Sequence, residues 1–183
     1  MNPLLSECLQ YLDDYIEFVS NGEQTVKLTE LIKSPHNPDG ILDLNYITPR
    51  SIHVAPIADK ALEDLVISEW LPQILAPKPY RDSPCSVKLS AGHNAPPSIF
   101  TVPNLTVLNF NFTLPKTAPG FEYLSSAQSL TDLTLTEGQS YDGVYRKHLD
   151  ILPSQLAQLS NLTRLELDTQ SIHFHAFVFP TQL

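Results

Sequence analysis

The sequence predicts an α/β fold, organised as a repeat solenoid with an N-terminal amphipathic helix. Three segments share the pattern LxxLxL, which alternates apolar and polar residues as a strand does. Near the N-terminus, apolar residues instead recur at the helical spacings of three and four. The 183 residues include 28 leucines and 16 prolines but only 6 glycines, a composition that suits a leucine-rich framework with rigid connections.

Residues 1–22 are predicted to be an N-terminal helix or cap, with the helix itself over residues 2–20. Asn2 is a good capping residue, Pro3 suits the first helical turn, and Asn21-Gly22 is a natural stop. The apolar stripe consists of Leu5, Cys8, Leu9, Leu12, Tyr15, Ile16 and Val19. We expect this stripe to pack on the rest of the domain; the alternative is that it docks on a partner.

Residues 23–183 are predicted to form an irregular solenoid, whose clearest repeats lie within residues 95–170. The three matched segments begin at Leu105, Leu130 and Leu162, and the second residue of each is Thr. Fainter units begin at residues 41, 62 and 84; the one at 62 reads LEDLVI, and the one at 84 contains Val87 and Leu89. Successive first positions are 21, 22, 21, 25 and 32 residues apart. A repeated period of this size predicts stacked supersecondary units.

These units resemble the leucine-rich repeat family, in its LPxxLxxLxxLxxLxL form, over about two-thirds of the chain. The resemblance implies a leucine-rich-repeat solenoid with parallel strands on the concave face. It further implies that the leucines, among them Leu133 and Leu165, point into the core, and that the domain binds proteins rather than catalysing a reaction.

The sequence departs from the family at the asparagine that follows LxxLxL. The corresponding residues are Trp70 in the fainter unit and Thr113, Gly138 and Gln170 in the clear ones. No asparagine ladder can form from these positions, so we expect the turn backbone to be satisfied by hydroxyls, amides or water.

In this arrangement the residues between the leucines form a concave strip that is rich in hydroxyls and mildly acidic. The fainter unit at 62 would add Glu63, Asp64, Val66 and Ser68 to this strip. The strip residues predicted to bind a partner are Thr106, Asn109, Asp132, Thr134, Thr136, Arg164, Glu166 and Asp168. The alternative is an ordinary polar sheet face, because strands favour Thr in any case.

An insertion at residues 137–148 lengthens the repeat that begins at Leu130. Insertions in solenoids form loops, often on the binding face. Tyr141, Tyr145 and Arg146 are of the residue types enriched in binding hot spots, so we predict that they contribute. The alternative is a tolerated surface loop.

The formal net charge of −9 disfavours phosphate backbones and anionic lipid, so no nucleic-acid or membrane partner is expected. The same charge favours a protein or peptide partner with a basic patch. The N-terminus does not resemble a signal peptide, and Cys8 and Cys85 have no disulfide or metal-type spacing. We therefore predict a cytoplasmic location.

No motif of a known catalytic class occurs in the sequence, and we predict neither an enzyme nor a cofactor. His148, His173 and His175 could in principle ligate zinc, which makes a histidine-based metal protein the less favoured alternative.

The sequence ends in a further partial repeat, because residues 179–183 copy residues 152–156. An uncapped solenoid end leaves its core open. The chain is therefore expected to be a fragment, a structural or recognition segment of a larger effector or regulatory protein; the alternative is that this segment is an improvised cap.

Overall fold

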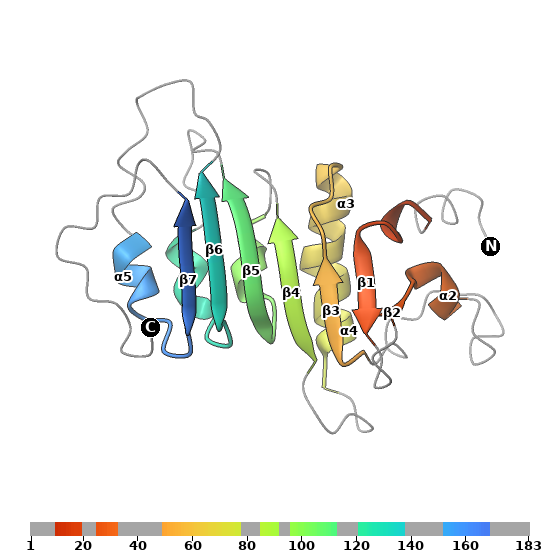
Figure 1. Ribbon diagram of the computed structural model, residues 1–183. Helices are drawn as coiled ribbons and strands as arrows, with labels where there is room; N and C mark the ends of the chain where they lie inside the picture. Colours follow the sequence, from red (N-terminus) through yellow and green to blue (C-terminus); the bar gives the residue numbers. More distant parts are fainter. Residues whose placement is uncertain are drawn as a thin grey trace.

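The computed structural model describes residues 10–19, 25–32, 49–77, 85–91, 96–112, 121–137 and 152–168. It is a mixed α/β structure with a seven-stranded sheet, in the order β2-β1-β3-β4-β5-β6-β7 (Figure 1). The strands are β1 (Ile16–Val19), β2 (Thr25–Val26), β3 (Ser51–Val54), β4 (Ser86–Ala91), β5 (Leu105–Phe112), β6 (Asp132–Glu137) and β7 (Arg164–Asp168). The helical segments are α2 (Leu28–Ile32), α3 (Lys60–Leu65), η2 (Val66–Trp70), α4 (Leu71–Leu75), η3 (Pro97–Thr101), η4 (Phe121–Ser126) and α5 (Leu152–Leu156).

Strands β3 to β7 are parallel and follow one another in chain order, whereas β1 runs antiparallel to both β2 and β3. Each connection between successive parallel strands contains a helical segment: α3, η2 and α4 after β3, η3 after β4, η4 after β5, and α5 after β6. In Figure 1 these segments lie behind the sheet, except α5, which is drawn beside β7. The opposite face of the sheet, which we call the open face, has no described helix over it.

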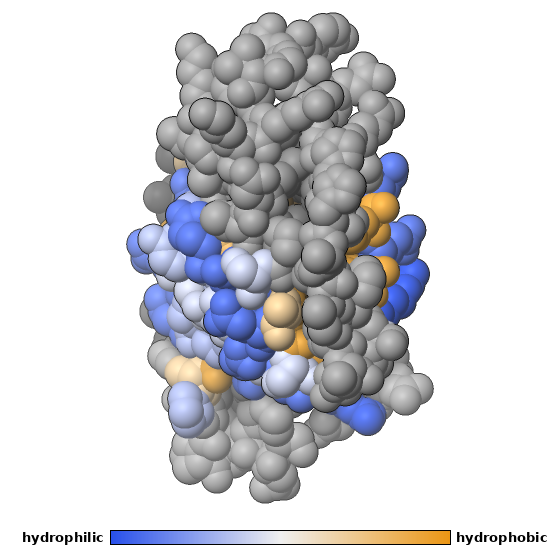
Figure 2. All heavy atoms as spheres, turned by 90° about the vertical axis from the view of Figure 1, so that its left-hand side faces the viewer, coloured by the Kyte–Doolittle hydropathy of each residue, from blue (hydrophilic) through white to orange (hydrophobic). Residues whose placement is uncertain are grey.

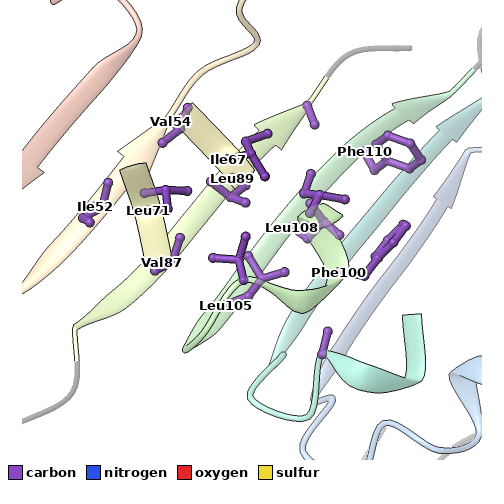
Figure 3. Packing of buried hydrophobic residues seen from close by; sticks show 14 of the residues in the cluster. Ile52, Val54, Ile67, Leu71, Val87, Leu89, Phe100, Leu105, Leu108 and Phe110 are labelled. Carbon is purple, nitrogen blue, oxygen red and sulfur yellow. The ribbon is translucent and has the colours of Figure 1, made fainter. Parts of the chain in front are cut away.

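The apolar side chains of the parallel strands line up across the sheet and face the helical segments (Figure 3). One such row consists of Val54, Leu89, Leu108, Leu133 and Leu165, and the next of Ala91, Phe110, Leu135 and Leu167. Leu108, Leu133 and Leu135 have no exposed surface. Burying a side chain of this size contributes about 1.5–3 kcal/mol to the free energy of unfolding, so these rows fix the register of the sheet.

This register confirms the alignment of the three clear repeats. Leu108 pairs with Leu133, and Leu133 pairs with Leu165, which reproduces the predicted steps of 25 and 32 residues. The first leucines of the three units, Leu105, Leu130 and Leu162, are also fully buried. The inward orientation predicted for Leu133 is therefore confirmed. Leu165 is only partly buried, although it packs against the core; β7 pairs with β6 alone among the described strands.

The unit predicted to begin at residue 84 was placed out of register by two residues. Leu89 pairs with Leu108 and so occupies the fourth position of its unit, not the sixth. Ala91, opposite Phe110, occupies the sixth position, and an irregularity between Val87 and Lys88 places Val87 beside Leu105. Sequence matching failed here because a unit with few leucines does not fix its own register.

The prediction of a repeat strand at residues 62–67 was wrong, because these residues are helical. Asp59 caps α3, its Oδ1 accepting hydrogen bonds from the backbone N–H groups of Ala61 (2.9 Å) and Leu62 (3.1 Å). The buried residues of the layer, Val66, Ile67, Leu71, Ile74 and Leu75, recur at helical and not at strand spacing. The four residues that this unit would have added to the open face, Glu63, Asp64, Val66 and Ser68, therefore belong to the helical layer.

The N-terminal helix is also shorter than predicted, because residues 16–19 form β1. Helix is present at residues 10–12, and residues 1–9 lie outside the described part of the chain. The Asp13 carboxylate accepts hydrogen bonds from the backbone N–H and the hydroxyl of Thr29, which ties this turn to α2. Ile16 and Phe18 then pair with Val54 and Ile52 of β3. Residues 16–19 fit the apolar spacing of a helix as well as that of a strand, and their pairing with β3 selects the strand.

Candidate functional site

The candidate functional site is the open face, whose side chains form polar rows that cross the strands. They point away from the helical layer because successive residues of a strand alternate between its two faces. The central row consists of Glu17, His53, Lys88, Val107, Asp132 and Arg164, each paired with the next. A second row consists of Ser90, Asn109, Thr134 and Glu166, and a third of Asn111, Thr136 and Asp168.

These rows bring together seven of the residues predicted to bind a partner. They are Asn109, Asp132, Thr134, Thr136, Arg164, Glu166 and Asp168. Four of them, Asn109, Arg164, Glu166 and Asp168, are exposed, and the other three are half-buried. In Figure 2, which looks at the β7 end of the molecule, hydrophilic residues lie along the right-hand margin, the side of the open face, with hydrophobic residues among them.

The β6–β7 end of the open face carries an excess of negative charge. Arg164 lies 3.1 Å from Asp132 Oδ2 through Nη1 and 3.1 Å from Glu166 Oε2 through Nη2. The Arg164 and Glu166 side chains are 65% and 57% exposed, so water screens these ion pairs and each contributes little to stability. With Asp168, three carboxylates stand against one guanidinium at this end.

The β1–β4 part of the open face contains three charged or titratable residues that sequence reasoning missed. His53 Nδ1 lies 3.8 Å from Glu17 Oε2, and Lys88 is the neighbour of His53 on the next strand. Lys88 is exposed, and no ion pair joins it to another residue in the described part of the chain. The alternation of Lys88 with Val87 and Leu89 could have revealed its orientation, whereas β1 and β3 gave no repeat signal.

Comparison with protein-family models, with curated proteins and with solved structures found no match to this chain. The rows of the open face are therefore interpreted from their own chemistry.

Thr106 takes no part in these rows, although it was predicted to bind a partner. Its Oγ1 donates a hydrogen bond to the carbonyl oxygen of Val87. Thr131 Oγ1 donates in the same way to Thr106, and Thr163 Oγ1 to Thr131, each bond being 3.0 Å long. The threonine that recurs after the first leucine of each clear repeat thus forms a ladder that links one strand to the next. The threonines of this ladder do not occupy the positions at which leucine-rich repeats have asparagine.

A second set of hydrogen bonds links the helical segments, and its donors include side-chain amides. Asn161 Nδ2 donates to the carbonyl oxygen of Gln128 (2.7 Å). Gln128 Nε2 donates to the carbonyl oxygens of Ser125 (2.6 Å) and Gln158 (3.3 Å). Hydroxyls and amides therefore satisfy several connection carbonyls and hold neighbouring repeats in the register that aligns the open face. The turns at Thr113, Gly138 and Gln170, where we expected such groups, lie outside the described part of the chain.

The substitution Thr131→Val tests the threonine ladder, because it keeps the side-chain shape and removes the hydroxyl. We expect the free energy of unfolding to fall by about 0.5–1.5 kcal/mol, the usual net contribution of one hydrogen bond. The carbonyl of Thr106 still accepts the Thr131 backbone N–H at 2.9 Å, so it is not left unpaired. Urea denaturation measures the change. Thr134→Val on the open face is the control and should stay within about 0.5 kcal/mol of wild type; equal losses in the two variants would contradict a specific role for the ladder.

Several residues singled out from the sequence lie outside the described part of the chain. They are Ile41, Leu44 and Tyr46 of the first fainter unit, Thr113, Gly138 and Gln170, the predicted binding residues Tyr141, Tyr145 and Arg146, the histidines His148, His173 and His175, and the C-terminal residues 179–183. Among the described residues, no group of three or more His, Cys, Asp or Glu side chains could hold a metal ion. A search of the same residues for a helix of membrane-spanning length and hydropathy found none.

Proposed function

We propose that this chain is a leucine-rich-repeat solenoid that acts as a non-catalytic protein-binding domain through its open face. In this proposal the open face is the concave face. The parallel strands in chain order, the aligned inward leucines and the helical segments on the opposite face support it. A cytoplasmic location is part of the proposal.

The observation that carries the binding function is the alignment of exposed and half-buried polar side chains over five neighbouring strands, β3 to β7. Asn109 and Asn111 are exposed on β5, whose backbone is hydrogen-bonded to β4 on one side and to β6 on the other. Their side-chain donors and acceptors are therefore available to a partner. Rigid strands also hold these groups at fixed spacing, so binding would cost little backbone ordering.

The charge of the open face indicates the chemistry of the partner. Asp132, Glu166 and Asp168 outnumber Arg164 at the β6–β7 end, and the whole chain carries a formal charge of −9. A protein or peptide with a basic patch would be attracted to this end, which accelerates the encounter. Because the charges are exposed, salt should weaken the attraction; the screening length is about 8 Å at physiological ionic strength.

Charge reversal tests the proposal. We select ligands from a displayed peptide library against the wild-type chain and measure their association rates with the variant Asp132→Lys, Glu166→Lys, Asp168→Lys. The expected result is an association rate about tenfold slower or more, since steering by charge accounts for about 10–1,000-fold in rate. The wild-type rate should also fall as salt rises.

The matched control is Asp14→Lys, Glu69→Lys, Glu122→Lys, which changes the net charge equally at exposed residues off the open face. It should bind the selected peptides as wild type does, apart from the small effect of net charge. Thermal unfolding verifies that both variants are folded. If the two triple variants lose binding equally, or if wild-type rates are indifferent to salt, the open face is not the binding surface.

A further inference from the structure

Charge on the open face is divided along the strand order, and this division restricts what can bind there. The β6–β7 end carries Asp132, Glu166 and Asp168 against the one cation Arg164. On β4, three strands from Arg164 in the central row, the charged residue is Lys88.

The cation at the acidic end is already engaged, whereas the cation on β4 is not. Arg164 lies at ion-pair distance from both Asp132 and Glu166. Lys88 is exposed, and among the described residues no carboxylate lies at ion-pair distance from it. Its neighbours in the central row are His53, which lies 3.8 Å from Glu17, and the apolar Val107. A purely basic ligand that extended from β7 to β4 would therefore meet repulsion at Lys88.

Uncharged hydrogen-bonding groups surround Lys88 and continue toward the acidic end. Ser86 and Ser90 flank Lys88 on the same face of β4, and Asn109 is the neighbour of Ser90 on β5. Hydroxyl and amide groups can bind a carboxylate beside a lysine, and they can also bind the peptide groups of a segment that crosses the strands.

We propose that the partner segment is dipolar: a carboxylate of the ligand pairs with Lys88, and basic side chains of the same segment pair with Asp132, Glu166 and Asp168. This rests on the proposed binding function and adds the charge pattern and orientation of the ligand. Neighbouring strands are about 4.8 Å apart, so Lys88 is about 10 Å from the Asp132 strand and about 14 Å from β7. An extended peptide advances about 3.3 Å per residue, so the acidic and basic residues of the ligand are about three or four residues apart.

Two synthetic peptides of identical composition test this inference. In the separated peptide, one glutamate is followed by two uncharged residues and then by two lysines; in the control peptide, the glutamate lies between the two lysines. Both have blocked termini, and fluorescence anisotropy measures their dissociation constants. We expect the separated peptide to bind about fivefold more tightly, which is the upper range for one exposed ion pair.

The variant Lys88→Glu should remove this preference and weaken the separated peptide by about five- to tenfold, because an attraction is replaced by a repulsion. The matched control is Lys60→Glu, the same charge change at an exposed residue of α3 in the helical layer. It should keep both the affinity and the preference. Backbone amide shifts in NMR spectra should move at Lys88 and Asn109 with the separated peptide.

The outcomes distinguish this inference from the proposed function. If both peptides bind equally well and lose binding only in the triple variant at Asp132, Glu166 and Asp168, the proposed function stands and the dipolar ligand is wrong. If peptides are bound without dependence on either set of residues, both are wrong. If neither synthetic peptide binds while library peptides do, the dipolar ligand is again wrong. Sedimentation could also show that the wild-type chain self-associates and that the Lys88→Glu variant does not. In that case the partner on the open face would be a second copy of the chain, and the dipolar peptide would be wrong.

Discussion

Leu133→Ala is expected to lower the free energy of unfolding by about 2–5 kcal/mol, the range for truncating a buried leucine. Leu133 belongs to a core row, has no exposed surface, and is paired with Leu108 and Leu165. The cavity would open beside two neighbouring strands, and the backbone hydrogen bonds of β6 to β5 and β7 restrict its collapse. Urea denaturation, followed by circular dichroism, measures the change.

Two companion variants make this expectation specific. Leu165→Ala should cost less than Leu133→Ala, because Leu165 is only partly buried at β7. Thr134→Ala, one residue along β6 from Leu133 and on the open face, should change stability by about 0.5 kcal/mol or less. A Thr134 variant as unstable as the Leu133 variant would mean that the inward and outward faces of β6 are exchanged.

Phe100→Ala is expected to have a comparable or larger effect, a loss of about 3–5 kcal/mol. Phe100 of η3 is fully buried between two other aromatic rings. Its ring centroid lies 5.9 Å from that of Phe110, in an edge-to-face arrangement, and 6.2 Å from that of Phe121. Removal of the ring eliminates apolar burial, both aromatic contacts and the packing of η3 against η4 and β5. Calorimetric unfolding measures the change.

Tyr123→Ala is the matched aromatic control for this cluster. Tyr123 lies in η4 two residues from Phe121, but 47% of its surface is exposed. We expect its truncation to change stability by about 0.5 kcal/mol or less. If Phe100→Ala were equally mild, the aromatic cluster would not be the part of the core that holds the helical layer on the sheet.

Both core substitutions also affect the candidate site indirectly. Leu133 alternates with Asp132 and Thr134, so the residue that anchors β6 in the core sets the position of two open-face side chains. A variant that weakens the core is therefore unsuitable for mapping the binding surface, and charge reversals at exposed residues serve that purpose better. The measured stability of each charge variant separates the two effects.

The strand repeats were predictable because their signal is local. In the segments that begin at Leu105, Leu130 and Leu162, period-two alternation is combined with a shared Thr, and a one-residue slip would turn the leucines to solvent. The same pattern placed Asn109, Thr134 and Glu166 on one face, and the cross-strand register brings these three together.

Where the pattern was weak, the prediction was wrong. The LEDLVI segment at residues 62–67 matches a strand repeat by its apolar positions alone, yet the Asp59 cap and the apolar residues that continue to Leu75 favour a helix. Residues 16–19 fit the end of an amphipathic helix, yet they form a strand because β3 offers backbone partners and a buried face. A short apolar run fits both the helical spacing of three to four residues and the strand spacing of two, so tertiary contacts decide which structure forms.

By itself, the sequence determined which side chains of β5, β6 and β7 face inward, because alternation along a strand needs no knowledge of its neighbours. Only the tertiary structure decided which strands precede β5 in the sheet and in what register, since a unit with few leucines does not fix its own register: Leu89, and not Val87, lies beside Leu108. That register places Lys88 in one row with Asp132 and Arg164, and it directs the Thr106 hydroxyl to Val87 instead of to a ligand. Side-chain direction follows from local backbone geometry, whereas the charge pattern of a surface depends on contacts between residues far apart in the chain.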